Sequence, residues 1–181
     1  MLLLLASFAA AQSAPAPTAP PAVVTPTAPR FAKIPVGSCG CSLYAPPGLS
    51  FGAPEKSPDG ADVWTGEVTI DGYTWGAIVA KFATPMEGTP DRMEPLLVAY
   101  MEFLRGQLGI VANVGVGRGH THSENPAARG VIDFWKDAVG DSWAVKGWVD
   151  NRLIAVLFVS GKQDYPYLTA QSLYLDGFRF D

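Results

Sequence analysis

Residues 131–160, VIDFWKDAVGDSWAVKGWVDNRLIAVLFVS, decide the fold of this chain. Their apolar, aromatic and β-branched residues predict three strands, at Val131–Val139, Ser142–Val149 and Leu153–Ser160. Gly140-Asp141 and Asp150-Asn151 separate these strands, and residues of these types are typical of turns. Because strands joined by short turns pair as antiparallel neighbours, we expect a three-stranded antiparallel meander.

A hairpin is predicted upstream of this meander. Asp62–Ile70 and Tyr73–Phe82 flank Asp71-Gly72, a pair that favours the positive φ angles of a type I′ turn. Shorter extended segments are expected at Ser38–Tyr44 and Leu49–Ala53. The first part of the domain is therefore also expected to consist of strands.

One long helix separates the hairpin from the meander. Thr89-Pro90-Asp91 is typical of a helix start, and Gly109 of a helix end. Helical spacing predicts a buried stripe of Leu96, Leu97, Tyr100, Met101, Leu104 and Leu108. Pro95 falls inside this segment, so the regular helix is expected to begin only near it.

The remaining segments complete the expected fold. Val111–Val116 is predicted as a strand, followed by a long glycine-rich loop to about Arg129. Pro166 is expected to open a second, short helix that Gly177 closes. The prediction is an α+β fold: a single antiparallel β-sheet of about six to eight strands with one long and one short helix packed on it.

The amino-terminal sequence predicts export. Residues 1–11 are apolar, too short to span a bilayer, and end in an A-x-A pattern, as a signal peptide does, although no basic residues precede them. The alternative is a merely apolar tail. Residues 12–33, rich in proline, alanine and threonine, are expected to form a flexible tether, and residues 34–181 a single domain. We therefore expect a periplasmic or secreted protein with no transmembrane segment in the mature chain.

The charge balance excludes several partners. The net charge is −4, only 17% of the residues are charged, and lysine and arginine do not cluster. Nucleic acids and anionic membrane surfaces bind to concentrated basic faces. We therefore expect neither as a partner.

Two short phrases resemble a known family. Ala45-Pro46-Pro47-Gly48-Leu49-Ser50-Phe51, the tail Leu173-Tyr174-Leu175-Asp176-Gly177-Phe178-Arg179-Phe180 and the order of elements over about residues 34–181 are similar to the PsbP/Mog1-like superfamily. Members of that superfamily mostly bind proteins, so the resemblance implies a non-catalytic binding or assembly module. The matching positions are packing and turn residues, and no functional residue is carried over.

The only cysteines and the only histidines of the chain occur as two close pairs. Cys39 and Cys41 are two residues apart, as are His120 and His122. Thiolates and imidazoles together would suit zinc or copper, so a shared Cys2His2 metal site is one hypothesis. The alternatives are a disulfide or two small, half-buried apolar residues on a strand for the cysteines, and a solvated loop for the histidines.

Motifs for catalysis are weak. Ser123 is adjacent to His122 but lies in no nucleophile elbow, and the glycines from Gly115 to Gly119 lack the lysine of a phosphate loop. Asp133 and Asp137 would share a strand face, yet nothing in the sequence indicates a perturbed pKa. We expect no enzymatic activity.

Tryptophan suggests a possible binding surface. A sheet can present aromatic residues to a partner, although tryptophan also fills cores. Strand alternation places Phe134 and Lys136 on the face opposite Trp135 and Asp137, so some aromatic side chains are expected to meet solvent. The candidate interface comprises Trp64, Trp75, Trp135, Trp143 and Trp148.

Together these patterns predict an exported, non-catalytic binding or assembly module. It would act through an unknown protein partner or as a homo-oligomer, with no cofactor. The alternative is an envelope metal-handling protein that holds zinc or copper with Cys39, Cys41, His120 and His122.

Overall fold

The computed structural model describes residues 30–162 and 168–181. The predicted signal peptide, most of the predicted tether, and Pro166 lie outside these residues. The domain extends upstream of the predicted start at Ile34, because a strand begins at Ala32 and the Phe31 ring packs 5.6 Å from that of Trp75.

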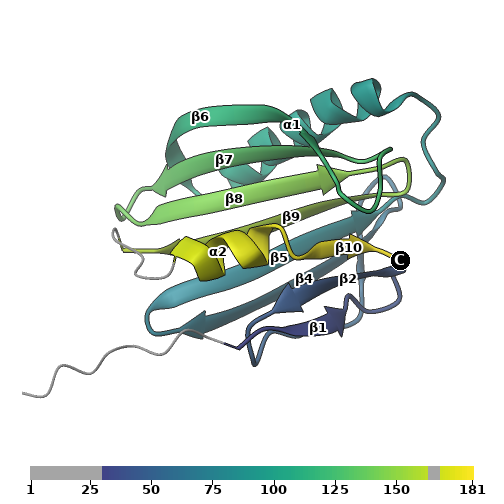
Figure 1. Cartoon of the computed structure of the whole chain (residues 1–181). Helices are drawn as coiled ribbons and strands as arrows, with labels where there is room; N and C mark the ends of the chain where they lie inside the picture. The colour runs from purple at the N-terminus through teal and green to yellow at the C-terminus, as the bar shows by residue number, and fades with distance from the viewer. Residues whose placement is uncertain (1–29, 163–167) are drawn as a thin grey trace, which may run out of the picture.

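Within the described residues, ten strands form two antiparallel sheets (Figure 1). The larger sheet has seven strands, which in spatial order are β3 (Glu55–Lys56), β4 (Asp62–Ile70), β5 (Tyr73–Lys81), β9 (Leu153–Gly161), β8 (Ser142–Val149), β7 (Arg129–Asp137) and β6 (Ile110–Thr121). The smaller sheet contains β1 (Ala32–Pro35), β2 (Cys41–Ala45) and β10 (Phe178–Phe180), in that order. The two helices are α1 (Pro90–Gln107) and α2 (Leu168–Leu175).

The α+β prediction is confirmed, including its antiparallel main sheet and its one long and one short helix. The predicted hairpin is present as β4 and β5, with Asp71 at φ 52° and Gly72 at φ 81° in the turn. The smaller sheet is an addition to the prediction. It forms because the tail Phe178–Phe180 pairs with β2, opposite Cys41–Leu43.

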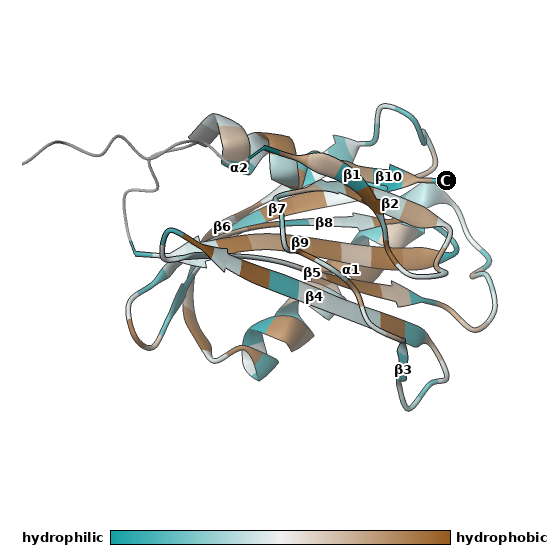
Figure 2. Cartoon of the chain, turned by 90° about the horizontal axis from the view of Figure 1, so that it is seen from below, coloured by the Kyte–Doolittle hydropathy of each residue, from teal (hydrophilic) through white to brown (hydrophobic). Residues whose placement is uncertain are grey.

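The molecule has three layers, with the smaller sheet and α2 on one face of the main sheet and α1 on the other (Figure 2). A core therefore lies on each side of the main sheet. The α1 side buries Met93, Leu97, Met101 and Leu104 of the helix. The other side contains Tyr174 of α2, whose hydroxyl donates to the Gly76 carbonyl at 2.7 Å. β9 is the middle strand and is covered on both faces, so all nine of its residues are buried.

Helix α1 begins at Pro90, so the prediction that the regular helix starts near Pro95 is wrong. Pro95 is the sixth residue of the helix and has no N–H to donate to the Asp91 carbonyl, yet the helix continues through it to Gln107. The helix end is close to the predicted one, with Leu108 as C-cap and Gly109 at φ 67°.

The predicted glycine-rich loop is mostly strand. β6 continues to Thr121 and pairs with β7 through three register shifts, which leaves residues 122–128 as the connection. Gly115 and Gly119 have φ angles of 153° and 77°, which residues with a Cβ rarely adopt. Glycine therefore supports the bulges of this strand, where the sequence pattern suggested that it ends the strand.

Candidate interaction surface

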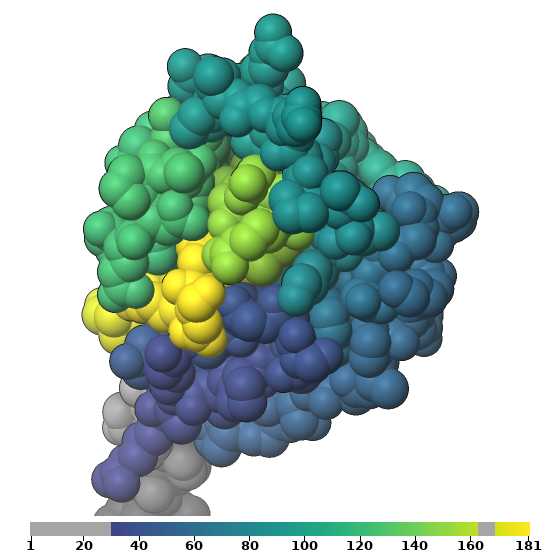
Figure 3. All heavy atoms as spheres, turned by 90° about the vertical axis from the view of Figure 1, so that its right-hand side faces the viewer, coloured from purple at the N-terminus to yellow at the C-terminus, as the bar shows by residue number. Residues whose placement is uncertain are grey.

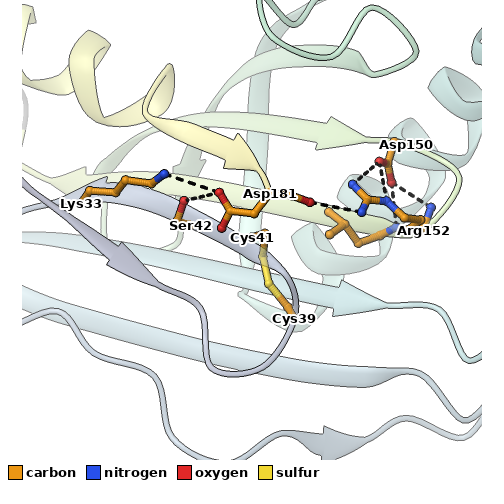
Figure 4. The surroundings of a disulfide bond; sticks show 8 residues. Lys33, Cys39, Cys41, Ser42, Asp150, Arg152 and Asp181 are labelled. Atoms are coloured by element: carbon orange, nitrogen blue, oxygen red, sulfur yellow. Dashed lines mark hydrogen bonds and ion pairs between the residues drawn. A yellow bond between two sulfur atoms is a disulfide. The ribbon is translucent and has the colours of Figure 1, made fainter.

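Cys39 and Cys41 form a disulfide, which is one of the alternatives that the sequence left open. Their Cα atoms lie 5.4 Å apart, both residues are buried, and Gly40 between them has φ 75°. The bridge lies beside Asp181 (Figure 4). The backbone N–H of Asp181 donates to the Gly40 carbonyl. In this state neither sulfur is a thiolate that could bind a metal ion.

His122 is buried against the end of β10. Its Nε2 donates to the Phe178 carbonyl at 2.9 Å, and its Nδ1 accepts from the Glu124 N–H at 3.2 Å. The rings of Trp148 and Phe180 meet the imidazole edge to face, with centroids 5.0 and 5.2 Å away. Figure 3 shows β10, in yellow, next to the green residues of this connection. Nε2 therefore holds the β6–β7 connection on the smaller sheet, and Nδ1 is paired within the connection itself.

The four residues of the hypothetical Cys2His2 site do not form a common centre. The cysteines are bonded to each other, the nitrogens of His122 are already paired, and His120 lies within β6 opposite Gly130. Within residues 30–162 and 168–181, no three His, Cys, Asp or Glu side chains gather so that they could hold an ion. The histidine pair is also not part of a solvated loop, because β6 and the packing of His122 order it.

The tryptophans do not form the predicted surface. Trp64, Trp75, Trp135 and Trp148 are buried, and Trp143 is half-buried with its ring 5.1 Å from that of Phe158. The reason is that the smaller sheet and α2 cover one face of the main sheet and α1 covers the β6–β8 part of the other, so these tryptophans enter a core. The alternation argument does hold for Phe134, which remains 47% exposed.

The aspartates of β7 have structural partners. Asp133 is buried and accepts from the Trp135 indole at 2.6 Å and from the Phe134 N–H at 2.8 Å. Burial alone would raise the pKa of Asp137, but hydrogen bonds from the Trp143 indole and nearby backbone N–H groups hold it below its ordinary value of 3.8. Each carboxylate is thus occupied with fixing a strand or a turn.

An exposed apolar surface lies instead at one end of the main sheet. β6 is the outermost strand there, and its Val111, Val114 and Val116 are 66%, 83% and 36% exposed. Phe134 of the neighbouring β7 extends the apolar area. We call these four residues the β6 edge. Sequence reasoning missed this surface because the residues of a strand do not show that it is the outermost strand of its sheet.

The sequence matches no protein-family model, and it matches no curated protein at a significant level. Neither helix of the described residues is both long and apolar enough to cross a membrane.

Proposed function

We propose that this protein is an exported, non-catalytic assembly module that associates with a second copy of itself through the β6 edge. The observation that carries the proposal is the exposure of three valines along a 12-residue strand at the border of the sheet. Soluble proteins usually protect such borders, because the outward N–H and C=O groups of an edge strand are ready to pair with another strand.

The two borders of the main sheet differ in a way that supports this choice. At the opposite border, β3 has only two residues, Glu55 and Lys56, and both are charged and exposed. Short length and charge are common means of preventing strand pairing. β6 is six times as long and carries only one charged side chain, Arg118.

The residue order of β6 also suits pairing between identical strands. A two-fold axis near Gly115 would bring the Val114 side chains of the two copies together near the centre of the pair, each beside Phe134 of its own copy. The same arrangement would place the two Arg118 side chains near opposite ends of the pair. The contact would therefore join like apolar groups without bringing like charges together.

Replacing Val114 with lysine should prevent this association. Two lysines would meet at the centre of the paired strands, and like charges on facing strands are destabilising. Sedimentation equilibrium of the purified protein should show a dimer for the wild type and a monomer for Val114→Lys. Val139→Lys is the matched control, because Val139 is 85% exposed but lies in the turn after β7. A monomeric wild type, or a dimer that both variants retain, would contradict the proposal.

Export has its own measurement. If residues 1–11 are removed during export, the intact mass of protein recovered outside the cytoplasm should correspond to a chain that begins near Gln12. Recovery of the full-length mass from that fraction, or of protein only from the cytoplasm, would contradict export.

A further inference from the structure

Among the described residues, no helix packs on the β4–β5 part of the sheet face that carries α1. Helix α1 packs on β6, β7 and β8, and it leaves β4 and β5 uncovered on the same face. A groove of about 720 Å³ lies between the helix and these strands. Val63 and Ile78 form part of its floor, and Tyr100 and Phe103 of α1 form part of its wall.

The dimensions of the groove match an α-helix. Its lining residues on α1 run from Leu96 to Gln107, a distance of about 16 Å at 1.5 Å per residue. Packed helices lie about 8–10 Å apart, which is about two strand spacings of 4.8 Å. A second helix in the groove would lie beside α1 and over β4 and β5, whose residues form the floor, and it would complete the layer.

The lining is apolar along its length and acidic at one end. Phe103 is 57% exposed, and Val63, Ile78 and Tyr100 are half-buried, so a shallow apolar strip is open to solvent. Glu55 and Asp59 line the groove, and no lysine, arginine or histidine does. Among the described residues neither carboxylate forms an ion pair, although Asp59 accepts a hydrogen bond from the Ser57 hydroxyl.

The negative charge of Asp59 acts on the Tyr100 hydroxyl in the groove. Burial raises the pKa of Tyr100, and the charge of Asp59 raises it further. The hydroxyl therefore remains a neutral donor, and the charge of this region comes from the two carboxylates. Basic side chains are the complement of such a site.

We propose that this groove binds an amphipathic, basic α-helix of a partner protein. The apolar stripe of that helix covers Val63, Ile78 and Phe103, and its lysine or arginine side chains meet Glu55 and Asp59. This is the helix-in-groove mode of recognition, in which apolar anchors one turn apart provide most of the contact. The groove is separate from the β6 edge, so the protein would bind its partner and a second copy at different surfaces.

Two stapled helical peptides of about 12 residues test the proposal, since such a helix spans about 18 Å. Both carry leucine at the same helical spacing, and they differ only in having lysines or glutamates beside the stripe. By fluorescence anisotropy, the lysine peptide should bind about three- to tenfold more tightly at low salt, and added salt should reduce this preference. The double variant Glu55→Lys/Asp59→Lys should remove it.

Further variants locate the binding. Phe103→Ala should weaken the lysine peptide by about fivefold or more, because it removes an aromatic anchor. Leu173→Ala is the control for this change, since Leu173 is 59% exposed but lies on α2, and Glu87→Lys is the control for the charge reversal. Both controls should bind as the wild type does, and so should Val114→Lys, whether or not the β6 edge forms a dimer.

Three outcomes would overturn the proposal. Equal affinity for the two peptides would show that Glu55 and Asp59 do not select a basic helix. Unchanged binding by Phe103→Ala would show that the peptide binds outside the groove. Binding of a long-chain alkylamine, with neither peptide bound, would show that the groove holds a small amphiphile in place of a protein helix.

Discussion

Replacing Leu97 with alanine should lower the free energy of unfolding by about 2–5 kcal/mol, as truncation of a fully buried leucine does. Leu97 has no exposed surface and lies at the centre of the core between α1 and the main sheet. A Cβ placed on Gly147 of β8 would lie 2.6 Å from Leu97 Cδ1. The close approach of helix and strand leaves little freedom for neighbouring side chains to fill the cavity.

Urea denaturation followed by circular dichroism measures this loss. Leu173→Ala is the control, because Leu173 is exposed and its truncation should change stability by no more than about 0.5 kcal/mol. A similarly small loss for Leu97→Ala would show that α1 buries a different face.

Replacing Asp150 with alanine should cost about 2–4 kcal/mol, because it removes a buried acceptor that several donors share. Asp150 accepts from the backbone N–H groups of Arg152 and Leu153 at 2.8 and 3.1 Å. It also accepts from the Arg152 guanidinium at 3.1 and 3.2 Å and from the Asn125 amide at 3.2 Å. Without the carboxylate, the turn between β8 and β9 would leave the buried N–H of Leu153 without this acceptor.

The same unfolding assay, with two further variants, identifies the cause. Asp150→Asn retains one carbonyl oxygen for the backbone donors, so its loss should be smaller than that of Asp150→Ala. Asn151→Ala changes an exposed residue of the same turn and should have little effect. If Asp150→Ala and Asn151→Ala were equally stable, the hydrogen bonds of Asp150 would not stabilise the turn.

Local patterns predicted most of the main sheet. The strands near 131–160, the hairpin at Asp71-Gly72 and the long helix all follow from side-chain periodicity and from turn or cap residues within a few positions. The boundaries of α1 and β6 were less predictable. The energetic cost of a proline in the first helical turns, or of a glycine at a β-bulge, depends on the contacts that the neighbouring residues make. The sequence of a single segment does not reveal those contacts.

The candidate site was harder to predict, because it depends on contacts between distant segments. His122 is buried only because β10, more than 50 residues later, lies against it. The tryptophans are buried because the helices and the smaller sheet cover the parts of the main sheet that carry them. Conversely, the β6 edge is exposed because the strand order places β6 last, and a strand's own residues do not specify its position in a sheet.

The smaller sheet determines when this domain can finish folding during its synthesis. β2 lies between β1, its near neighbour in sequence, and β10, which leaves the ribosome after every other described strand. Asp181 then contacts Lys33 and Ser42 on one side and Arg152 on the other (Figure 4). Until β10 is synthesised, the main sheet can pair its strands, but the core around Leu43 stays open. A nascent chain that still lacks β10 therefore cannot complete the smaller sheet. This step of folding follows the translation of β10.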